Sequence, residues 1–164
     1  MWKARPFIHS RERLIEWLVY FGIGLTVGSI AFVMKIIEEG LVHLANYVSF
    51  GLFLDGNGQT VPAWLVYITF CGFYGFVASS LTTYVSQAAA GSGVAELIGY
   101  VNGVNYHDFI GLSTLFVKVI GVVFAVSGKL AVGKEGPLAH IGAICGAMVV
   151  YTPCIDLRHL QFDE

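Results

Sequence analysis

The feature that most constrains this chain is an uninterrupted run, from position 56 to position 95, that contains no Asp, Glu, Lys or Arg. The apolar interior of this run is long enough for a membrane-spanning helix, which needs about 20 residues. A second uncharged stretch extends over positions 17–34. Only 12% of the chain is charged, against about 25% of a typical soluble domain. The sequence therefore predicts an all-α, multi-span membrane protein.

Charges that flank the first helical stretch predict its orientation. Four basic residues precede or open it: Lys3, Arg5, Arg11 and Arg13. No Lys or Arg occurs between positions 36 and 60, a segment that contains Glu38, Glu39 and Asp55. By the positive-inside rule, residues 1–14 are expected to form a cytoplasmic N-terminal segment, and the 36–60 connection to lie outside the cell or in a lumen. The sequence leaves open whether the membrane is the plasma membrane or an endosomal, lysosomal or vacuolar one.

Glycine and proline divide the chain into helices of unequal length. A first helix is expected from about position 12 to 35 and beyond, with Gly24-x-x-x-Gly28 permitting close helix packing. Glu38, Glu39 and His43 are expected to mark its end or an interfacial helix. The other expected elements are spans at 62–84 and 109–132, and helices at 94–101 and 135–150. Short, interrupted helices at membrane depth indicate a binding site inside a transporter or channel.

Two glycine-rich turns, Gly91-Ser-Gly93 and Gly133-Lys-Glu-Gly-Pro137, each lead into an expected helix start. A helix N-terminus presents unpaired N–H groups and a partial positive charge, so it attracts anions. Two such ends aimed at one point would bind an anion without a full countercharge, which keeps binding weak enough for release. The Ser92 hydroxyl would add a donor. The Glu135 carboxylate would occupy the anion position at its helix end and leave when protonated or displaced.

Simpler readings exist for each turn taken alone. Gly-Ser-Gly is a common loop tripeptide, and Lys134-Glu135 has the form of a solvated ion pair. Gly128, Gly133 and Lys134 also fit the first part of a nucleotide-binding P-loop. That motif requires Ser or Thr next, where this chain has a carboxylate, and no strand is expected before the glycines. The joint occurrence of both turns before short helices favours an anion site.

Other chemically active side chains receive structural interpretations. Lys118 and Lys129 are expected to snorkel to an interface, with a place along the pathway as the open alternative. His140 is expected to be packed and hydrogen-bonded rather than a proton relay. Glu96 is expected to tether the short helix through backbone amides. The three cysteines lack metal-site spacing and are expected to act as small buried side chains.

The two turns also carry a family resemblance. Gly91-Ser-Gly-Val-Ala-Glu96 is similar to the G-S-G-I-P-E motif of the CLC family of chloride channels and chloride/proton exchangers. Gly133-Lys-Glu-Gly-Pro137 matches that family's G-K/R-E-G-P motif without a change. Tyr100-Val-Asn-Gly-Val104 and Lys118-Val-Ile-Gly121 also resemble the family, especially its plant and organellar branches. The resemblance covers most of residues 15–150.

This resemblance implies roles for individual residues. Ser92 would be the central chloride ligand and Glu135 the gating glutamate. The other chloride-binding residues implied are Gly91, Gly93, Lys134 and Gly136. Serine at position 92 implies a preference for chloride over nitrate. Ala95 stands where the family usually has proline, which makes the geometry around Ser92 an open point.

The resemblance also implies an architecture and partners. Residues 15–164 would form a partial membrane domain, the first of two inverted repeats with short broken helices at membrane depth, without the second repeat or CBS domains. Chloride, protons and the lipid bilayer are the implied partners. A homodimer is expected for a complete member, and no enzyme activity, cofactor, metal or nucleic acid is expected.

The function predicted on this basis is chloride transport by a voltage-gated channel or a chloride/proton antiporter, with this chain as the N-terminal part of the pore domain. The alternative is a truncated, non-conducting membrane protein that associates with full-length relatives. The sequence does not distinguish channel from exchanger, because the family's internal proton-handling glutamate would lie beyond residue 164.

Overall fold

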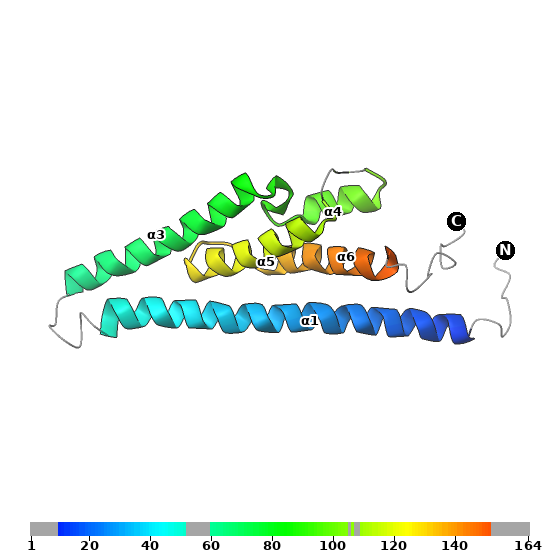
Figure 1. Ribbon diagram of the computed structural model, residues 1–164, viewed down its shortest axis with the longest axis horizontal. Coiled ribbons are helices and arrows are strands. Elements are labelled where there is room, and N and C mark those ends of the chain that lie inside the picture. Colours follow the sequence, from blue (N-terminus) through cyan, green and yellow to red (C-terminus); the bar gives the residue numbers. More distant parts are fainter. Residues whose placement is uncertain (1–9, 52–59, 105, 107–108, 152–164) are drawn as a thin grey trace.

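The computed structural model describes residues 10–51, 60–104, 106 and 109–151, and every regular element in these ranges is a helix (Figure 1). This confirms the all-α prediction. The elements are α1 (Ser10–Asn46), a π-helical turn (Tyr47–Gly51), α3 (Thr60–Tyr84), a 3-10 turn (Gln87–Ala89), α4 (Val94–Val101), α5 (Leu112–Ser127) and α6 (Glu135–Tyr151).

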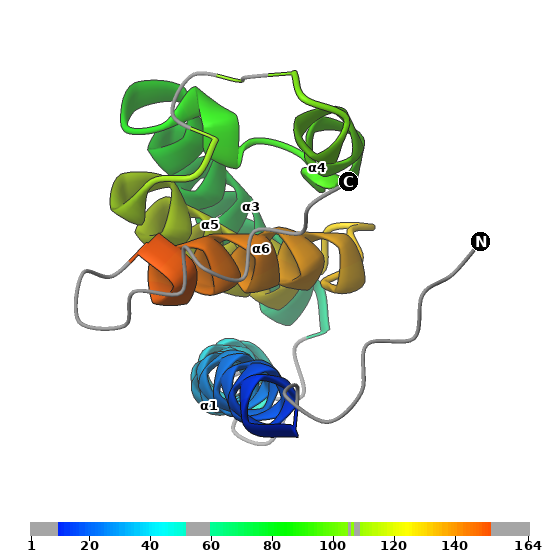
Figure 2. The same ribbon diagram turned by 90° about the vertical axis from the view of Figure 1, so that its right-hand side faces the viewer.

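The helices are arranged in layers, with α1 on one side and α5 and α6 packed along it (Figures 1 and 2). Helix α3 packs mainly on α5, and α4 contacts α6. The core between α1, α5 and α6 is built from Met34, Val123, Ile141 and Cys145. The Tyr74 hydroxyl of α3 donates a hydrogen bond to the Leu41 carbonyl of α1 at 3.2 Å, which ties the outer layer to the long helix.

Small residues do bring two helices together, but they lie on α6 rather than on α1. A Cβ at Gly142 would lie 3.9 Å from Val27, and one at Gly146 would lie 3.8 Å from Ile23. Helix α6 therefore runs antiparallel to α1. The close packing expected at Gly24 and Gly28 is not found within the described residues, where nothing lies within 4 Å of a Cβ at either position. Glycines at this spacing therefore do pack two helices of the described chain together, but at Gly142 and Gly146 rather than at the predicted positions.

Among the described residues, two helical stretches are long and apolar enough to span a bilayer, Trp17–Gly51 and Thr60–Tyr84. Little of either stretch is buried within the chain. Large side chains such as Trp17, Phe21 and Phe76 are about 70% exposed, which fits contact with lipid or other protein rather than with water. The second stretch confirms the span expected at 62–84. The first helix extends beyond position 35 as expected, and α1 ends at Asn46 with His43 in its last turn.

Helix α5 is shorter than expected. The predicted span at 109–132 is instead a helix that ends at Ser127, and residues 128–134 form a loop. Gly128 lies so close to α3 that a Cβ would stand 3.1 Å from the Cys71 carbonyl oxygen. Lys129 follows with a left-handed φ of 56°. The backbone turns there because helix geometry cannot continue through a left-handed residue.

The starts of the two short helices agree with the sequence-based expectation. Helix α4 covers Val94–Val101 with Ala95 in its first turn, and α6 begins at Glu135. Asn102 and Gly103 form the predicted turn after α4, with Gly103 at a φ of 89°. The basic residues Lys3 and Arg5, the expected turn at 55–58, Cys154 and the C-terminal segment from Asp156 lie outside the described residues.

Candidate anion site

The two glycine-rich turns meet in the structure, although the whole of α4 and α5 separates them in the sequence. A Cβ at Gly136 would lie 2.7 Å from the Ser92 Cβ and 3.4 Å from the side chain of Val94. The first turn of α6 therefore lies directly against the residues that open α4. The sequence-based prediction of an anion site requires the two helix starts to lie close together, and this contact brings them close.

Backbone conformation explains why glycine flanks Ser92. Gly91 and Gly93 have φ values of 65° and 76°, in the left-handed region that other residues avoid. Gly93 is the N-cap of α4, and its carbonyl accepts the first helical hydrogen bond from Leu97 N at 2.9 Å. Ser92 is exposed between them, with its Oγ 3.4 Å from the Val94 amide nitrogen. The turn thus presents the serine at the N-terminal end of the helix.

His140 supports this turn from behind. Its ring is fully buried, stacks on Phe109 with centroids 4.0 Å apart, and brings Nε2 within 3.0 Å of the Phe109 carbonyl oxygen. Nδ1 faces Gly93 so closely that a Cβ on Gly93 would collide with it. The prediction of a packed, hydrogen-bonded histidine is confirmed. Its position also makes a glycine at 93 a steric requirement.

A cavity of about 380 Å³ lies beside the serine turn. Its walls come from α3, α5, the turn before α4 and the loop before α6, with Gly91, Ser92, Gly133 and Pro137 among the lining residues. Residues of both glycine-rich turns therefore face one space. Gly93 and Gly136 pack behind this lining instead of forming it.

Lys118 also lines this cavity, and the expectation that it snorkels to an interface was wrong. Its side chain is 1% exposed, and Nζ donates a hydrogen bond to the Gly91 carbonyl at 3.0 Å. The residue lies in the middle of α5, on the face that packs toward the serine turn, so its ammonium group ends inside the protein. Lys129, in contrast, is exposed in the loop after α5.

The electrostatic character of the cavity follows from its lining. Lys118 is the ionisable residue of the described lining, and this lining contains no carboxylate. An ammonium group has three N–H donors, and a buried charge is stable only when it is paired or hydrogen-bonded. The N-terminus of α4 adds its partial positive charge at Ser92. The arrangement therefore suits a small anion.

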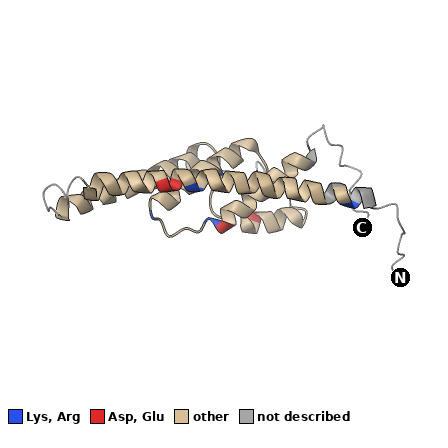
Figure 3. Cartoon of the chain, turned by 90° about the horizontal axis from the view of Figure 1, so that it is seen from below, with Lys and Arg blue, Asp and Glu red and all other residues tan. Residues whose placement is uncertain are grey.

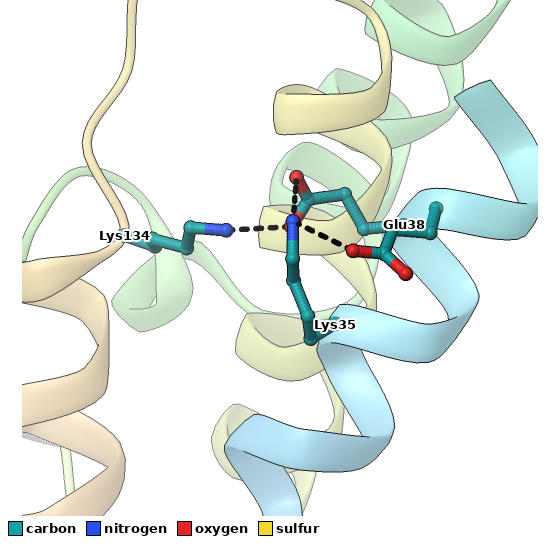
Figure 4. A network of polar contacts seen from close by, with 4 residues as sticks. Lys35, Glu38 and Lys134 are labelled. Carbon is teal, nitrogen blue, oxygen red and sulfur yellow. Dashed lines mark hydrogen bonds and ion pairs between the residues drawn. The ribbon is translucent and has the colours of Figure 1, made fainter.

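Lys134 and Glu135, the remaining predicted site residues, lie at the same helix start but outside the cavity lining. Glu135 is the first residue of α6 and is exposed. Lys134 Nζ lies 2.7 Å from Glu38 Oε2 on α1 (Figure 4). Chloride binding by Lys134 and gating by Glu135 stay predictions.

Sequence reasoning missed the partner of Lys134. Charged residues are sparse on the described chain, and several of them gather where α1 passes the start of α6 (Figure 3). A carboxylate inside an apolar helical stretch is costly unless it is paired. Glu38 carried that signal in the sequence, but its position was assigned to a helix end, where no partner is needed.

Comparison with known proteins identifies the family of the chain. The family model described as voltage gated chloride channel matches residues 74–163, more than half of the chain and including both turns. Chloride channel protein CLC-c of Arabidopsis thaliana is 34% identical over 147 residues, which cover 87% of this chain and 18% of that protein. The H(+)/Cl(−) exchange transporter 7 of Homo sapiens is 33% identical over 151 residues, covering 88% of this chain and 19% of that protein.

A third relative is chloride channel protein A of Dictyostelium discoideum, 32% identical over 141 residues that cover 86% of this chain and 16% of that protein. The chain thus spans less than a fifth of the length of these curated relatives. The match extends over both glycine-rich turns and over α5 between them. The chain belongs to the family of voltage-gated chloride channels.

Proposed function

We propose that this chain forms part of a chloride pathway across a membrane, in a channel or a chloride/proton exchanger. One observation supports the proposal most strongly. The cavity at the two helix starts combines a buried ammonium group, that of Lys118, with an exposed serine hydroxyl and no carboxylate in its described lining. The Gly91 carbonyl accepts one hydrogen bond from this ammonium group, and a chloride ion in the cavity would add the opposite charge that offsets the cost of burying it.

Within this proposal five residues of the two turns have roles. Ser92 donates its hydroxyl to chloride, and Gly91 and Gly93 give the backbone the shape that presents it. Gly136 allows the start of α6 to approach Ser92. Glu135 gates the pathway from the N-terminus of α6, where its carboxylate competes with chloride for the same positive potential.

The mode of transport is proposed in the same way. Some curated relatives are named as chloride channels and others as H(+)/Cl(−) exchange transporters. A gating carboxylate that responds to protons serves either mode. We also propose a cytoplasmic N-terminus, from the basic residues at its start, and a homodimer for the complete protein.

The experiment is a chimaera in which this chain replaces the segment that it matches in the human H(+)/Cl(−) exchange transporter 7. Chloride flux is measured in liposomes as a function of chloride concentration. Lys118→Met should weaken apparent chloride affinity by about tenfold or more, because hydrogen bonds to charged groups contribute about 1.5–3 kcal/mol.

Lys129→Met is the matched control, since it removes the same charge from the exposed loop after α5. It should leave the chloride dependence unchanged. Equal behaviour of the two variants would contradict the proposed site. A chimaera that inserts correctly and carries no chloride would favour the non-conducting alternative.

A further inference from the structure

Glu38 occupies an unusual place for a carboxylate. It lies in the interior of the apolar stretch Trp17–Gly51, well away from both ends, and its side chain is only 16% exposed. Its Oε2 is 2.7 Å from Lys134 Nζ, the distance of a strong charge-assisted hydrogen bond. The pair joins α1 to the turn that opens α6, which is distant in the sequence.

A second lysine and a second carboxylate extend the pair along α1 (Figure 4). Lys35 Nζ lies 3.6 Å from Glu38 Oε1 and 3.3 Å from Glu39 Oε1. Lys35 and Glu39 are 51% and 68% exposed, so their pairing is weakened by solvent. The Glu38–Lys134 pair is the less exposed and the better formed of these contacts.

The pair lines a different cavity from the one at the anion site. A separate cavity of about 210 Å³ is lined by Lys35, Glu38, Lys134 and apolar residues of α1, α5 and α6. None of these three charged residues lines the cavity that contains Ser92 and Lys118. The backbone of Lys134 thus belongs to the turn at the anion site, while its charge is held toward α1.

We propose that Glu38 is a positioning residue that neutralises Lys134 and keeps its charge away from the chloride pathway, and so sets how tightly chloride binds. The Lys134 side chain is 42% exposed, which leaves it room to reorient once its partner is gone. A free ammonium at the start of α6 would add a full positive charge beside the two helix N-termini. Chloride would then bind more tightly and leave more slowly.

This inference rests on the proposed function, and its test uses the same chimaera. Glu38→Gln should lower the chloride concentration for half-maximal flux by about two- to fivefold, the range that a partly exposed ion pair is worth. The maximal flux should fall as release slows. Glu38→Asp, which keeps the charge on a shorter side chain, should have a smaller effect and shows whether the charge or the packing matters.

Two controls isolate the mechanism. Glu39→Gln makes the same change in net charge at the next position along α1, at a side chain whose ion pair is with Lys35, and should leave the chloride dependence unchanged. In a Lys134→Met background, Glu38→Gln should have no further effect, because the charge that it would release is absent. Stability of each variant is followed by its thermal unfolding in detergent.

The inference is overturned if Glu38→Gln behaves as Glu39→Gln does, or if its effect persists in the Lys134→Met background. Failure of the proposed function looks different, since Lys118→Met would then leave the chloride dependence unchanged. A chimaera that responds to Lys118→Met and not to Glu38→Gln would retain the proposed site and remove Glu38 from its control.

Discussion

At the scale of single residues, the chemistry of the cavity depends on Lys118, whose ammonium group is buried and donates a hydrogen bond to the Gly91 carbonyl. Lysine in a membrane protein usually snorkels, and that general rule placed Lys118 at an interface. The structure buries it behind the Gly91 carbonyl because the short helix α5 places position 118 far from either helix end. The place of Ser92 and its flanking glycines before a helix start was predictable, because that motif is local in the sequence. The position of the Lys118 side chain, in contrast, is set by tertiary packing.

Glu135 is the residue whose proposed role is most sensitive to pH. Glu135→Gln imitates the protonated carboxyl group with the same size. In the chimaera this variant should carry chloride at every pH at the rate that the parent reaches at low pH, and it should lose coupling to protons. Flux across a pH series, with proton movement recorded in parallel, checks this. Glu39→Gln should keep the parent's pH dependence, and retention of that dependence by Glu135→Gln would remove Glu135 from the gate.

Gly93 allows the steric role of His140 to be measured. Gly91 and Gly93 share a left-handed backbone, so alanine at either should cost about 1–2 kcal/mol. Gly93→Ala should cost about 1–3 kcal/mol more, because its Cβ collides with His140, whereas nothing lies within 4 Å at Gly91. Thermal unfolding of the chain in detergent micelles, followed by circular dichroism, compares the two variants. Equal losses of stability would show that the His140 side chain moves away from the added Cβ without destabilising the chain.

At the scale of elements, the sequence predicted both ends of α3, α4 and α6 to within two residues, but not the bounds of α5 or the packing of α1. The starts of α4 and α6 follow from glycine and proline, which act locally. The end of α5 lies where Gly128 contacts α3, and Glu38 of α1 pairs with Lys134 of a distant turn. Neither contact has a local signal in the sequence.

Helix packing gives a direct comparison between two glycine pairs of the same spacing. Gly142→Leu should destabilise the chain by about 1–3 kcal/mol, because the added carbons would press on Val27 of α1. Gly24→Leu should be nearly neutral, since nothing lies within 4 Å of that position. Thermal unfolding of the two variants in detergent measures the difference. A larger loss at Gly24 would mean that α1 and α6 pack through a different face.

At the scale of the whole molecule, the described part of the chain presents large apolar side chains on both long helices and places two of its buried polar residues, Lys118 and His140, against the serine turn. Exposed apolar side chains of this kind suit contact with lipid or with other protein. The membrane class was predictable from composition alone, because so few residues are charged.

Orientation is tested by glycosylation. If the positive-inside rule is read correctly, an acceptor site inserted near Gly56 should be modified in microsomes, and one near His9 should not. The size shift of each product on a gel, with and without glycosidase, gives the result. Modification near His9 alone would place the N-terminus on the other side of the membrane.

The central claim is that an anion binds where the two helix starts and Lys118 face one cavity. Bromide replaces chloride and scatters anomalously, so crystals of the chimaera grown in bromide reveal its sites directly. We expect an anomalous peak within hydrogen-bond distance of the Ser92 hydroxyl, in the cavity lined by Lys118. This peak should be lost in Lys118→Met. An active chimaera with bromide sites elsewhere and none in this cavity would show that the anion site is not at the two helix starts.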